Sequence, residues 1–441
     1  MKLRSGVLAA FILSVVLPIN VSAQDSGTSS AEDEMFGGDL FSPETPADPP
    51  GGDPAPEAAD LTAGTLGVRL GGEFGFRVDE RILWRDLGPE DIASPTDTGL
   101  VPALYAGFTM DARPDEHFRV LAAGELSISD SGYLFKASEL FADWDWRDTL
   151  FFRAGKHAIH WGVGYFYSPA DVLNLTPIDP EDPEAAREGP LSIRLDVPFG
   201  LNSLRAYVIT RDIEDWTDVG VAAQGTFVLG DAEIGIGAFS RDGVSPRLTA
   251  TATFPVWKMS WFAEGAAGLG SDRSFVVEGE GGVLETAMYT DSLFFQATAG
   301  FMLNLTDIFV EAETIVLAAQ YYFNGTGYLD PSILLSPQIG PLRASGSLLP
   351  SDLAETGMQY AAARLSWIEV FGSDFTAAVS WTSNLSDLSG RLQPRLTLEL
   401  FDRLDLSASL SLSYGDPGEE FTPQGIDTVL QLTVDAGSGR F

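Results

Sequence analysis

The sequence predicts an all-β fold, a transmembrane antiparallel β-barrel of about 18 strands within a range of roughly 16 to 20. Three observations favour it. Hydrophobic residues recur at every second position in many segments, which is the period of a strand with two different faces. Short and long connections alternate between these segments, as in barrels that cross an outer membrane. The 441 residues include 46 glycines and only 20% charged residues, a composition too apolar for a disordered chain and too polar for a helical membrane protein.

Residues 1–23 have the organisation of an export signal. Lys2 and Arg4 precede an apolar run from Gly6 to Leu17, and residues 21–23 have the small-residue pattern that a signal peptidase accepts. The apolar run is shorter than the roughly 18 to 20 residues that a spanning helix needs. We therefore expect a cleaved signal peptide, with a membrane anchor as the alternative, and a mature protein located in the cell outer membrane.

Residues 24–63 are expected to form a disordered, acidic periplasmic tail. They are rich in Pro, Gly, Ser, Asp and Glu and contain no Lys or Arg, a composition that cannot bury a core. Within the tail, Met35, Phe36, Leu40 and Phe41 cluster around a Gly-Gly-Asp sequence. Apolar anchors in a disordered segment are typical of a docking motif for a periplasmic partner. A solvated spacer is the alternative interpretation.

The barrel itself is expected to span residues 64–441. Near its start, Leu66, Val68 and Leu70 alternate with Gly67 and Arg69, and the sharpest alternation covers residues 404–414. A water-soluble sandwich would alternate in the same way, so the connections decide between the two. We expect short links at 112–117, 147–149, 200–202, 230–231, 255–256 and 372–374, and long ones at 79–99, 158–190, 270–292, 324–355 and 415–425.

This parity gives about 18 strands, or about 20 if residues 270–292 form a membrane-spanning hairpin of their own. Closure of the barrel would remove the unpaired sheet edges. The chain ends in Phe441, and a C-terminal aromatic residue resembles the signal by which the barrel-assembly machinery recognises its clients. The expected surroundings are the lipid bilayer with lipopolysaccharide or an equivalent outer leaflet.

The charge and the residue types exclude several classes of function. With 63 acidic and 26 basic residues the net charge is −37, which argues against nucleic-acid binding and favours cations. The chain has no cysteine, so neither a disulfide nor a thiolate metal site can form. His157 and His160 lie three apart on a segment that does not favour a helix, and catalytic motifs are absent. We expect neither an enzyme nor a cofactor or metal.

The longest patterned segment lies within 158–190 and just before it. Gly155-Lys156, Trp161-Gly162, Pro169, Asp171, Asn174 and Arg187-Glu188 resemble a loop of poorly characterised Gram-negative outer-membrane barrels, which are porin-like proteins suspected of passing small or hydrophobic solutes. The resemblance covers roughly forty residues, and motifs of this kind are hypotheses until their context is known. Position 157 is His where that family commonly has Gln, and Leu175 follows Asn174 in place of proline.

A loop stiffened by Pro and Gly is expected to fold inward and form a charged constriction. The alternative is that its residues only brace it against the wall. The loop candidates for the constriction are Lys156, Trp161, Asp171, Asn174, Asp179, Arg187 and Glu188. The candidates from strands, where charges are costly toward lipid, are Arg69, Glu73, Arg119, Arg153 and Arg194, and further inward-facing charges are expected at Arg77, Glu125, Arg205, Arg247, Arg364, Arg391, Arg395 and Glu399.

These features predict a passive or weakly selective, cation-preferring channel for small solutes or ions. The alternatives are a plugged or lidded barrel that binds or takes up hydrophobic solutes, and an adhesin or structural outer-membrane protein. The lidded barrel and the adhesin depend on residues 324–355, which contain many Leu and Ile residues for an exposed loop. Such a loop could cover the barrel mouth, enter the lumen or bind a partner. A plugged barrel would be tethered by the acidic tail.

Overall fold

The computed structural model describes residues 67–87, 94–185, 187–210, 219–311, 313–401 and 404–437. The expected signal peptide at 1–23, the acidic tail at 24–63 with its apolar cluster, and the terminal Phe441 lie outside these residues. In the described ranges, no helix has both the length and the apolar character needed to cross a membrane.

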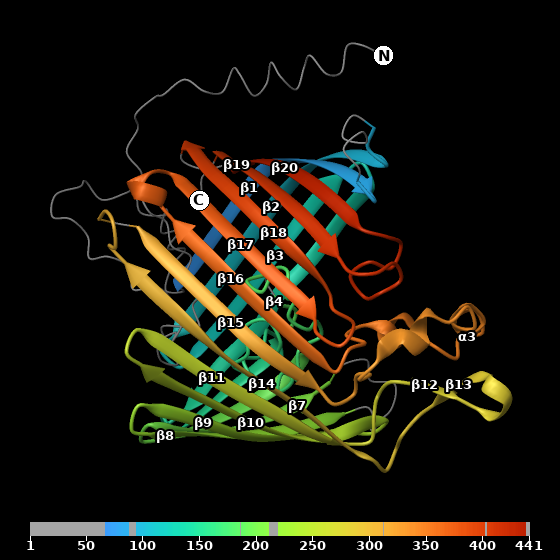
Figure 1. The fold of residues 1–441 in the computed structure, drawn as a ribbon. Helices are drawn as coiled ribbons and strands as arrows, with labels where there is room; N and C mark the ends of the chain where they lie inside the picture. Colours follow the sequence, from blue (N-terminus) through green and yellow to red (C-terminus); the bar gives the residue numbers. More distant parts are fainter. Residues whose placement is uncertain are drawn as a thin grey trace.

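Eighteen strands of the described residues form one sheet that closes on itself (Figure 1). Successive barrel strands pair in antiparallel register, and β1 (Gly67–Arg85) pairs with β20 (Asp427–Gly437) from Gly75 opposite Gly437 to Arg85 opposite Asp427. This last pairing joins the first strand to the last, so the sheet has no free first or last strand. The predicted fold class and strand number are confirmed.

The other barrel strands follow in chain order. They are β2 (Asp97–Asp115), β3 (Phe118–Ser129), β4 (Gly132–Trp146), β5 (Leu150–Lys156), β6 (Leu191–Phe199), β7 (Asn202–Ile209), β8 (Gly220–Leu229), β9 (Ala232–Arg241), β10 (Val244–Val256), β11 (Met259–Leu269), β14 (Leu293–Thr306), β15 (Thr314–Asn324), β16 (Gln359–Ile368), β17 (Phe375–Asn384), β18 (Ser389–Phe401) and β19 (Leu404–Tyr414).

The connections separate a turn end of the barrel from a loop end. The turn end carries links such as 116–117, 147–149, 200–201 and 230–231, and the loop end carries 157–190, 270–292, 325–358 and 415–426. The loop end also has tight turns at 130–131 and 242–243, so long and short links alternate less strictly than predicted. The link expected at 255–256 lies at 257–258, because Trp257 adopts the positive φ of 58° that closes this turn.

The possible extra hairpin at 270–292 does not cross the membrane. Its strands β12 (Phe275–Glu278) and β13 (Leu284–Ala287) are four residues long, whereas a spanning strand needs about 9 to 11. They form a separate two-stranded sheet, joined by the short 3-10 helix η2 (Glu280–Gly282). We call residues 270–292 and 325–358 together the outer lobe, which projects beyond the strand ends (Figure 1).

The outer lobe has its own small core. The connection 325–358 contains η3 (Pro331–Leu335), α3 (Ile339–Ala344) and η4 (Pro350–Leu353). Val276 and Leu284 from the hairpin pack with Ile339 and Leu348 from this connection. The apolar residues of 324–355 therefore have a structural explanation, because many of them bury each other within the lobe.

Strand alternation gives the barrel an apolar outer face and a polar inner face. Leu248 on β10 and Leu293 on β14 are 66% and 75% exposed, whereas Thr249 and Glu264, on the opposite phase of their strands, are 3% and 4% exposed. Burial on the inner phase results from the connection 157–190, which enters the lumen and contacts Thr249 and Glu264. The apolar face suits lipid, toward which strand charges cost about 2 to 4 kcal/mol at the bilayer centre.

Candidate functional site: the inner loop and the passage beside it

The connection between β5 and β6 folds into the barrel. Strand β5 ends at Lys156 after seven residues, and residues 157–190, the inner loop, contain no helix or named strand within their described part. Figure 1 shows this green segment inside the ring of strands. A loop without regular structure cannot satisfy its own backbone groups, so side chains of the barrel wall must supply many of the partners.

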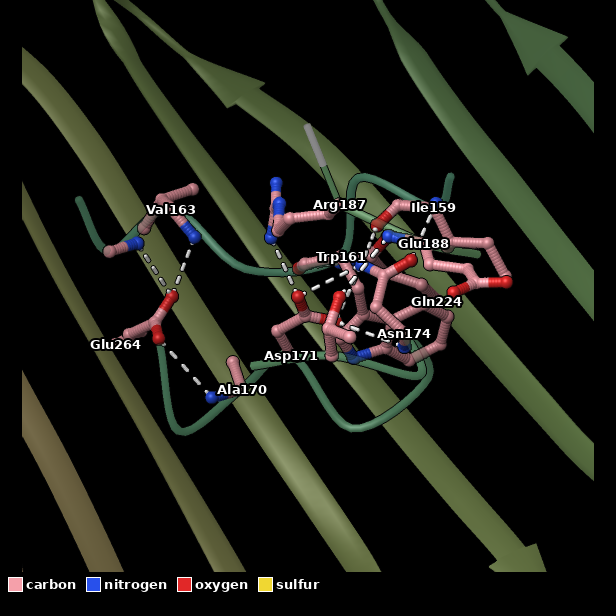
Figure 2. A network of polar contacts seen from close by, with 12 residues as sticks. Ile159, Trp161, Val163, Ala170, Asp171, Asn174, Arg187, Glu188, Gln224 and Glu264 are labelled. Atoms are coloured by element: carbon pink, nitrogen blue, oxygen red, sulfur yellow. Dashed lines mark hydrogen bonds and ion pairs between the residues drawn. The ribbon is translucent and has the colours of Figure 1, made fainter. Parts of the chain in front are cut away.

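Glu264 on β11 is the first of these wall anchors. One carboxylate oxygen accepts the backbone N–H groups of Val163 at 2.5 Å and Gly164 at 3.0 Å, and the other accepts that of Ala170 at 3.2 Å. Figure 2 shows this carboxylate bridging two parts of the loop. Hydrogen bonds to an ionised group are stronger than neutral ones, so this buried side chain fixes the loop at two points along its path.

Gln320 on β15 is the second anchor. Its Oε1 accepts the backbone N–H groups of Tyr165 at 3.1 Å and Phe166 at 2.7 Å, and its Nε2 donates to the Tyr167 carbonyl at 2.5 Å. The amide therefore uses both its acceptor and its donor on consecutive loop residues. Gln320 thus forms hydrogen bonds with the loop backbone in the way that a neighbouring strand would.

Trp161 is the apolar anchor. Its side chain is 1% exposed and packs edge-to-face on Tyr207 of β7 with ring centroids 5.6 Å apart. Its indole Nε1 donates to Thr249 Oγ1 at 3.0 Å, and its carbonyl accepts from Gln224 Nε2 at 3.1 Å. Gly237 on β9 leaves the room for this ring, because a Cβ there would lie 2.5 Å from Trp161 Cζ2.

The predicted charged residues of the motif brace the base of the loop. Asp171, with a side chain only 3% exposed, pairs with Arg187 at 2.6 Å, and Asn174 Nδ2 donates to Asp171 Oδ2 at 2.9 Å. Lys156 forms an ion pair with Glu188 across the loop's entry and exit. The structure thus places Lys156, Asp171, Asn174, Arg187 and Glu188 in a bracing network (Figure 2 shows the last four).

The far part of the loop reaches the opposite wall. Glu181 forms an ion pair with Arg391 on β18, and its other oxygen accepts from Gln393 Nε2 at 2.9 Å. Glu184 pairs with Arg364 on β16 at 3.4 Å. The loop is thus fastened on both sides of the lumen.

A passage remains between the loop and the wall. Two adjoining cavities of the described residues, about 340 and 220 Å³, share Arg364, Ala378 and Arg395 in their lining. The smaller cavity has Asp179, Glu181 and Asp182 of the loop on one side, and on the other Arg364, Arg395, Ser380, Gln393, Ser409, Ser411 and Gln431 of the wall. Loop carboxylates therefore face wall guanidinium groups across a polar gap.

Three charged side chains of this gap have no ion-pair partner among the described residues. Within the described part of the chain, Asp179, Asp182 and Arg395 form no ion pair, in contrast to Glu181 and Arg364 beside them. Their side chains are exposed. Unpaired charges on opposite walls of a narrow lumen are the groups with which a passing ion or solute interacts first.

Of the predicted strand residues, Arg119, Arg153 and Arg194 lie elsewhere, toward the turn end. Their side chains are 6%, 1% and 12% exposed. They form ion pairs within the wall, at 3.0 Å from Arg119 to Asp111, 2.7 Å from Arg153 to Asp143 and 2.7 Å from Arg194 to Asp196. Removing one partner of such a buried pair leaves the other charge buried without a partner, so these residues support the wall.

Arg69 and Glu73 occupy a third place. Both lie on the inner phase of β1, opposite Asp111 and Gly107 of β2 in the register, and both are exposed. They therefore line the part of the lumen that the inner loop leaves open. Arg77, four residues beyond Glu73 on the same face of β1, pairs with Asp435 on β20 at 2.5 Å.

Comparison with known proteins adds the following. Neither a protein-family model nor a curated protein matches the sequence. Among solved structures, OccAB1 of Acinetobacter baumannii is 10% identical, with 84% of this chain and 96% of that chain covered and a TM-score of 0.49. Pseudomonas aeruginosa OprD is 9% identical (83% and 95% covered, TM-score 0.44), and Pseudomonas aeruginosa OpdK, solved with vanillate, is 10% identical (84% and 99%, TM-score 0.45).

Proposed function

We propose that this chain is a porin-like outer-membrane channel through which small solutes pass with weak, cation-preferring selectivity. The observation that carries the proposal is the gap in which the exposed Asp179 and Asp182 of the inner loop face Arg395 of β18. A plug would fill this space with packed or paired side chains. Here the charges on both sides remain available to solute.

The wall along the gap favours an aqueous path. Its inner phase carries small or neutral polar side chains, with Ser380, Gln393, Ser409, Ser411 and Gln431 in the lining. Such residues hydrate readily and present no apolar barrier that could dewet the lumen. The two adjoining cavities extend along the wall from β15 to β20, and in the larger one the polar Ser366, Thr376 and Thr397 lie beside the apolar Val316 and Ala318.

The balance of charge sets the direction of the selectivity. The smaller cavity is lined by three carboxylates and two guanidinium groups, and the whole chain has a net charge of −37. A small excess of negative charge raises the local concentration of cations, and mobile ions screen the effect over about 8 to 10 Å. We therefore infer a modest cation preference that decreases as the salt concentration rises.

The proposed organisation extends to the remaining chain. Residues 1–23 would direct export, residues 24–63 would form the periplasmic tail with its docking segment, and residues 64–441 would form the barrel. The apolar outer face suits the bilayer and lipopolysaccharide, and insertion would require the barrel-assembly machinery. The alternative of hydrophobic-solute uptake has less support, because apolar residues of 325–358 such as Ile339 and Leu348 form the core of the outer lobe.

Planar-bilayer recording of the mature protein tests this function. We expect discrete conductance steps and, in a potassium chloride gradient, a reversal potential on the cation-selective side. Heat-modifiable migration on a gel would confirm that the inserted protein is a folded barrel. A folded barrel that shows no steps would refute the open channel and favour a plugged binding protein.

A further inference from the structure

Two neighbouring carboxyl groups, Glu355 at the base of the outer lobe and Glu420 in the next long connection, play no part in the passage described above. Glu355 lies in the connection 325–358 and Glu420 in the connection 415–426. Thr356, the residue that follows Glu355, donates its backbone N–H to Glu420 Oε2 at 3.2 Å. The pair therefore joins two loops that are distant in the sequence.

Glu420 has more hydrogen-bond partners in the described part of the protein than Glu355 has. One of its oxygens, Oε2, accepts from Tyr360 OH at 2.7 Å, Asn384 Nδ2 at 2.8 Å and Thr356 Oγ1 at 2.9 Å. Its backbone N–H donates to Asp387 Oδ2 at 3.2 Å. Glu420 thus connects its own loop to strands β16 and β17 and to the connection 325–358.

Glu355 is held in place by its backbone more than by its carboxylate. Its φ is 47°, a left-handed conformation that is strained for a residue other than glycine. Its carbonyl accepts from Asn324 Nδ2 at 2.9 Å and from Arg273 Nη1 at 3.2 Å. In the described part of the chain, its carboxylate has one hydrogen-bond partner, Tyr322 OH at the long distance of 3.5 Å.

A stack of tyrosines connects this pair to the inner loop. Tyr322 of β15 and Tyr360 of β16, the hydroxyl partners of Glu355 and Glu420, both contact the ring of Tyr167 in the inner loop. The ring centroids are 4.9 Å apart for Tyr167 and Tyr322 and 5.5 Å apart for Tyr167 and Tyr360. Movement of the carboxyl pair would therefore shift the inner loop, which lines the passage, through these tyrosine rings.

We propose that Glu355 and Glu420 form a proton-responsive latch that couples the connections 325–358 and 415–426 to the inner loop. With a proton on the pair, the loops stay together. With both groups ionised, the two like charges repel each other and the latch loosens. The conductance readout rests on the proposed channel function, whereas the latch itself does not.

The sign of the effect follows from the surroundings. Burial, together with the charge of Glu420, raises the pKa of Glu355 from 4.5 to about 7, and burial also raises the pKa of Glu420. The closed latch therefore prefers the proton, and its stability falls as the pH rises from the ordinary value of 4.5 to about 7. The other charged or titratable groups facing the pair are Arg273 of the hairpin connection, Asp387 of the link 385–388, and Tyr167, Tyr322 and Tyr360.

The first test records single channels at about pH 6 and about pH 8. We assume that only Glu355 titrates, with a pKa of 4.5 when the latch is open and about 7 when it is closed. The ratio of channels with an open latch to channels with a closed latch then rises about tenfold between these pH values. Glu355→Gln, which copies the protonated group, should hold the low-pH behaviour throughout. Glu280→Gln, an exposed acid in the same outer lobe, should retain the tenfold change.

The second test does not need conductance. Backbone hydrogen exchange of residues 349–358 and 415–426, corrected for the intrinsic pH dependence of exchange, should accelerate at the higher pH in the wild type and in Glu280→Gln, and not in Glu355→Gln. This pattern in a folded but silent barrel would support the latch and refute the channel. Equal protection at both pH values in the wild type, or a pH dependence that survives in Glu355→Gln, would overturn the latch.

Discussion

Glu181 of the inner loop forms an ion pair with Arg391 of β18, although 210 positions separate the two residues in the chain. The same carboxylate accepts from Gln393 Nε2 at 2.9 Å. The loop base is braced on the other side of the lumen, beside β5 and β6, where Lys156 pairs with Glu188 and Asp171 pairs with Arg187. This contact across the lumen therefore sets the width of the passage beside Asp179 and Asp182.

Replacing Glu181 by Gln should loosen the loop tip. Each partner is 28% exposed, and ion pairs of this kind contribute about 0 to 1 kcal/mol, so the barrel should keep its thermal stability. The tip should nevertheless fluctuate more, giving a higher mean conductance and more open-channel noise in planar bilayers. Glu280→Gln in the outer lobe is the matched control, and a wild-type noise spectrum in Glu181→Gln would contradict the contact's role.

Replacing Glu264 by Ala should release residues 163–170 of the inner loop from the wall. Three backbone N–H groups lose their acceptor, and each buried donor left unpaired costs about 1 to 3 kcal/mol. We expect the segment around residues 163–170 to become sensitive to proteolysis, while the barrel strands stay protected in hydrogen exchange. Glu264→Gln, which keeps an acceptor oxygen, should be milder.

The control for this experiment is Glu233→Ala. Glu233 lies on the inner phase of β9, opposite Thr253 of β10, and no described contact links it to the inner loop. Its loss should leave the loop protected. Equal cleavage in Glu264→Ala and Glu233→Ala would show that the carboxylate does not hold the loop.

Neutralising the exposed loop acids should change the ion selectivity. With Asp179→Asn and Asp182→Asn combined, the smaller cavity keeps one carboxylate, Glu181, against Arg364 and Arg395. The field in the gap then favours anions, and we expect the cation-to-anion permeability ratio to fall about twofold or more. Arg395→Gln should shift it the opposite way.

Reversal potentials in a salt gradient measure this ratio. Asp330→Asn, which removes an exposed acid of the outer lobe that caps η3, serves as the control and should leave the potential unchanged. A double variant with the wild-type reversal potential would place the selectivity elsewhere in the lumen. Wild-type selectivity toward anions would refute the cation preference itself.

The barrel could be predicted from the sequence because its information is local. Alternating segments such as 404–414 need only the period of a strand, and Lys156, Asp171, Asn174, Arg187 and Glu188 lie close enough in the chain to stand out as one motif. Exact turns were less predictable. The turn at 257–258 depends on a positive φ at Trp257, a conformation that large side chains seldom adopt.

The partners of the loop depend on long-range closure. Glu264 and Gln320 lie about 100 and 154 positions from the loop groups that they bind, and only the register of the closed sheet brings them there. The available signal was a lone acid on an otherwise uncharged inner phase of β11, where its neighbours on that face are Ser260, Phe262, Ala266 and Gly268. The Glu355 and Glu420 pair has the same origin, because its loops meet only when β15 to β20 are assembled.

Trp161→Ala should distinguish packing of the inner loop from stability of the barrel as a whole. The indole is 1% exposed, and truncation of a buried Trp costs about 3 to 5 kcal/mol. It also removes the donor to Thr249. Because the strand ladder stays intact, we expect the loop to lose hydrogen-exchange protection before the barrel unfolds, at a lower temperature than in the wild type.

Trp257→Ala, at a site 79% exposed, is the matched control and should leave the loop protected. Simultaneous loss of loop and strand protection in Trp161→Ala would show that the inner loop is part of one cooperative unit with the wall.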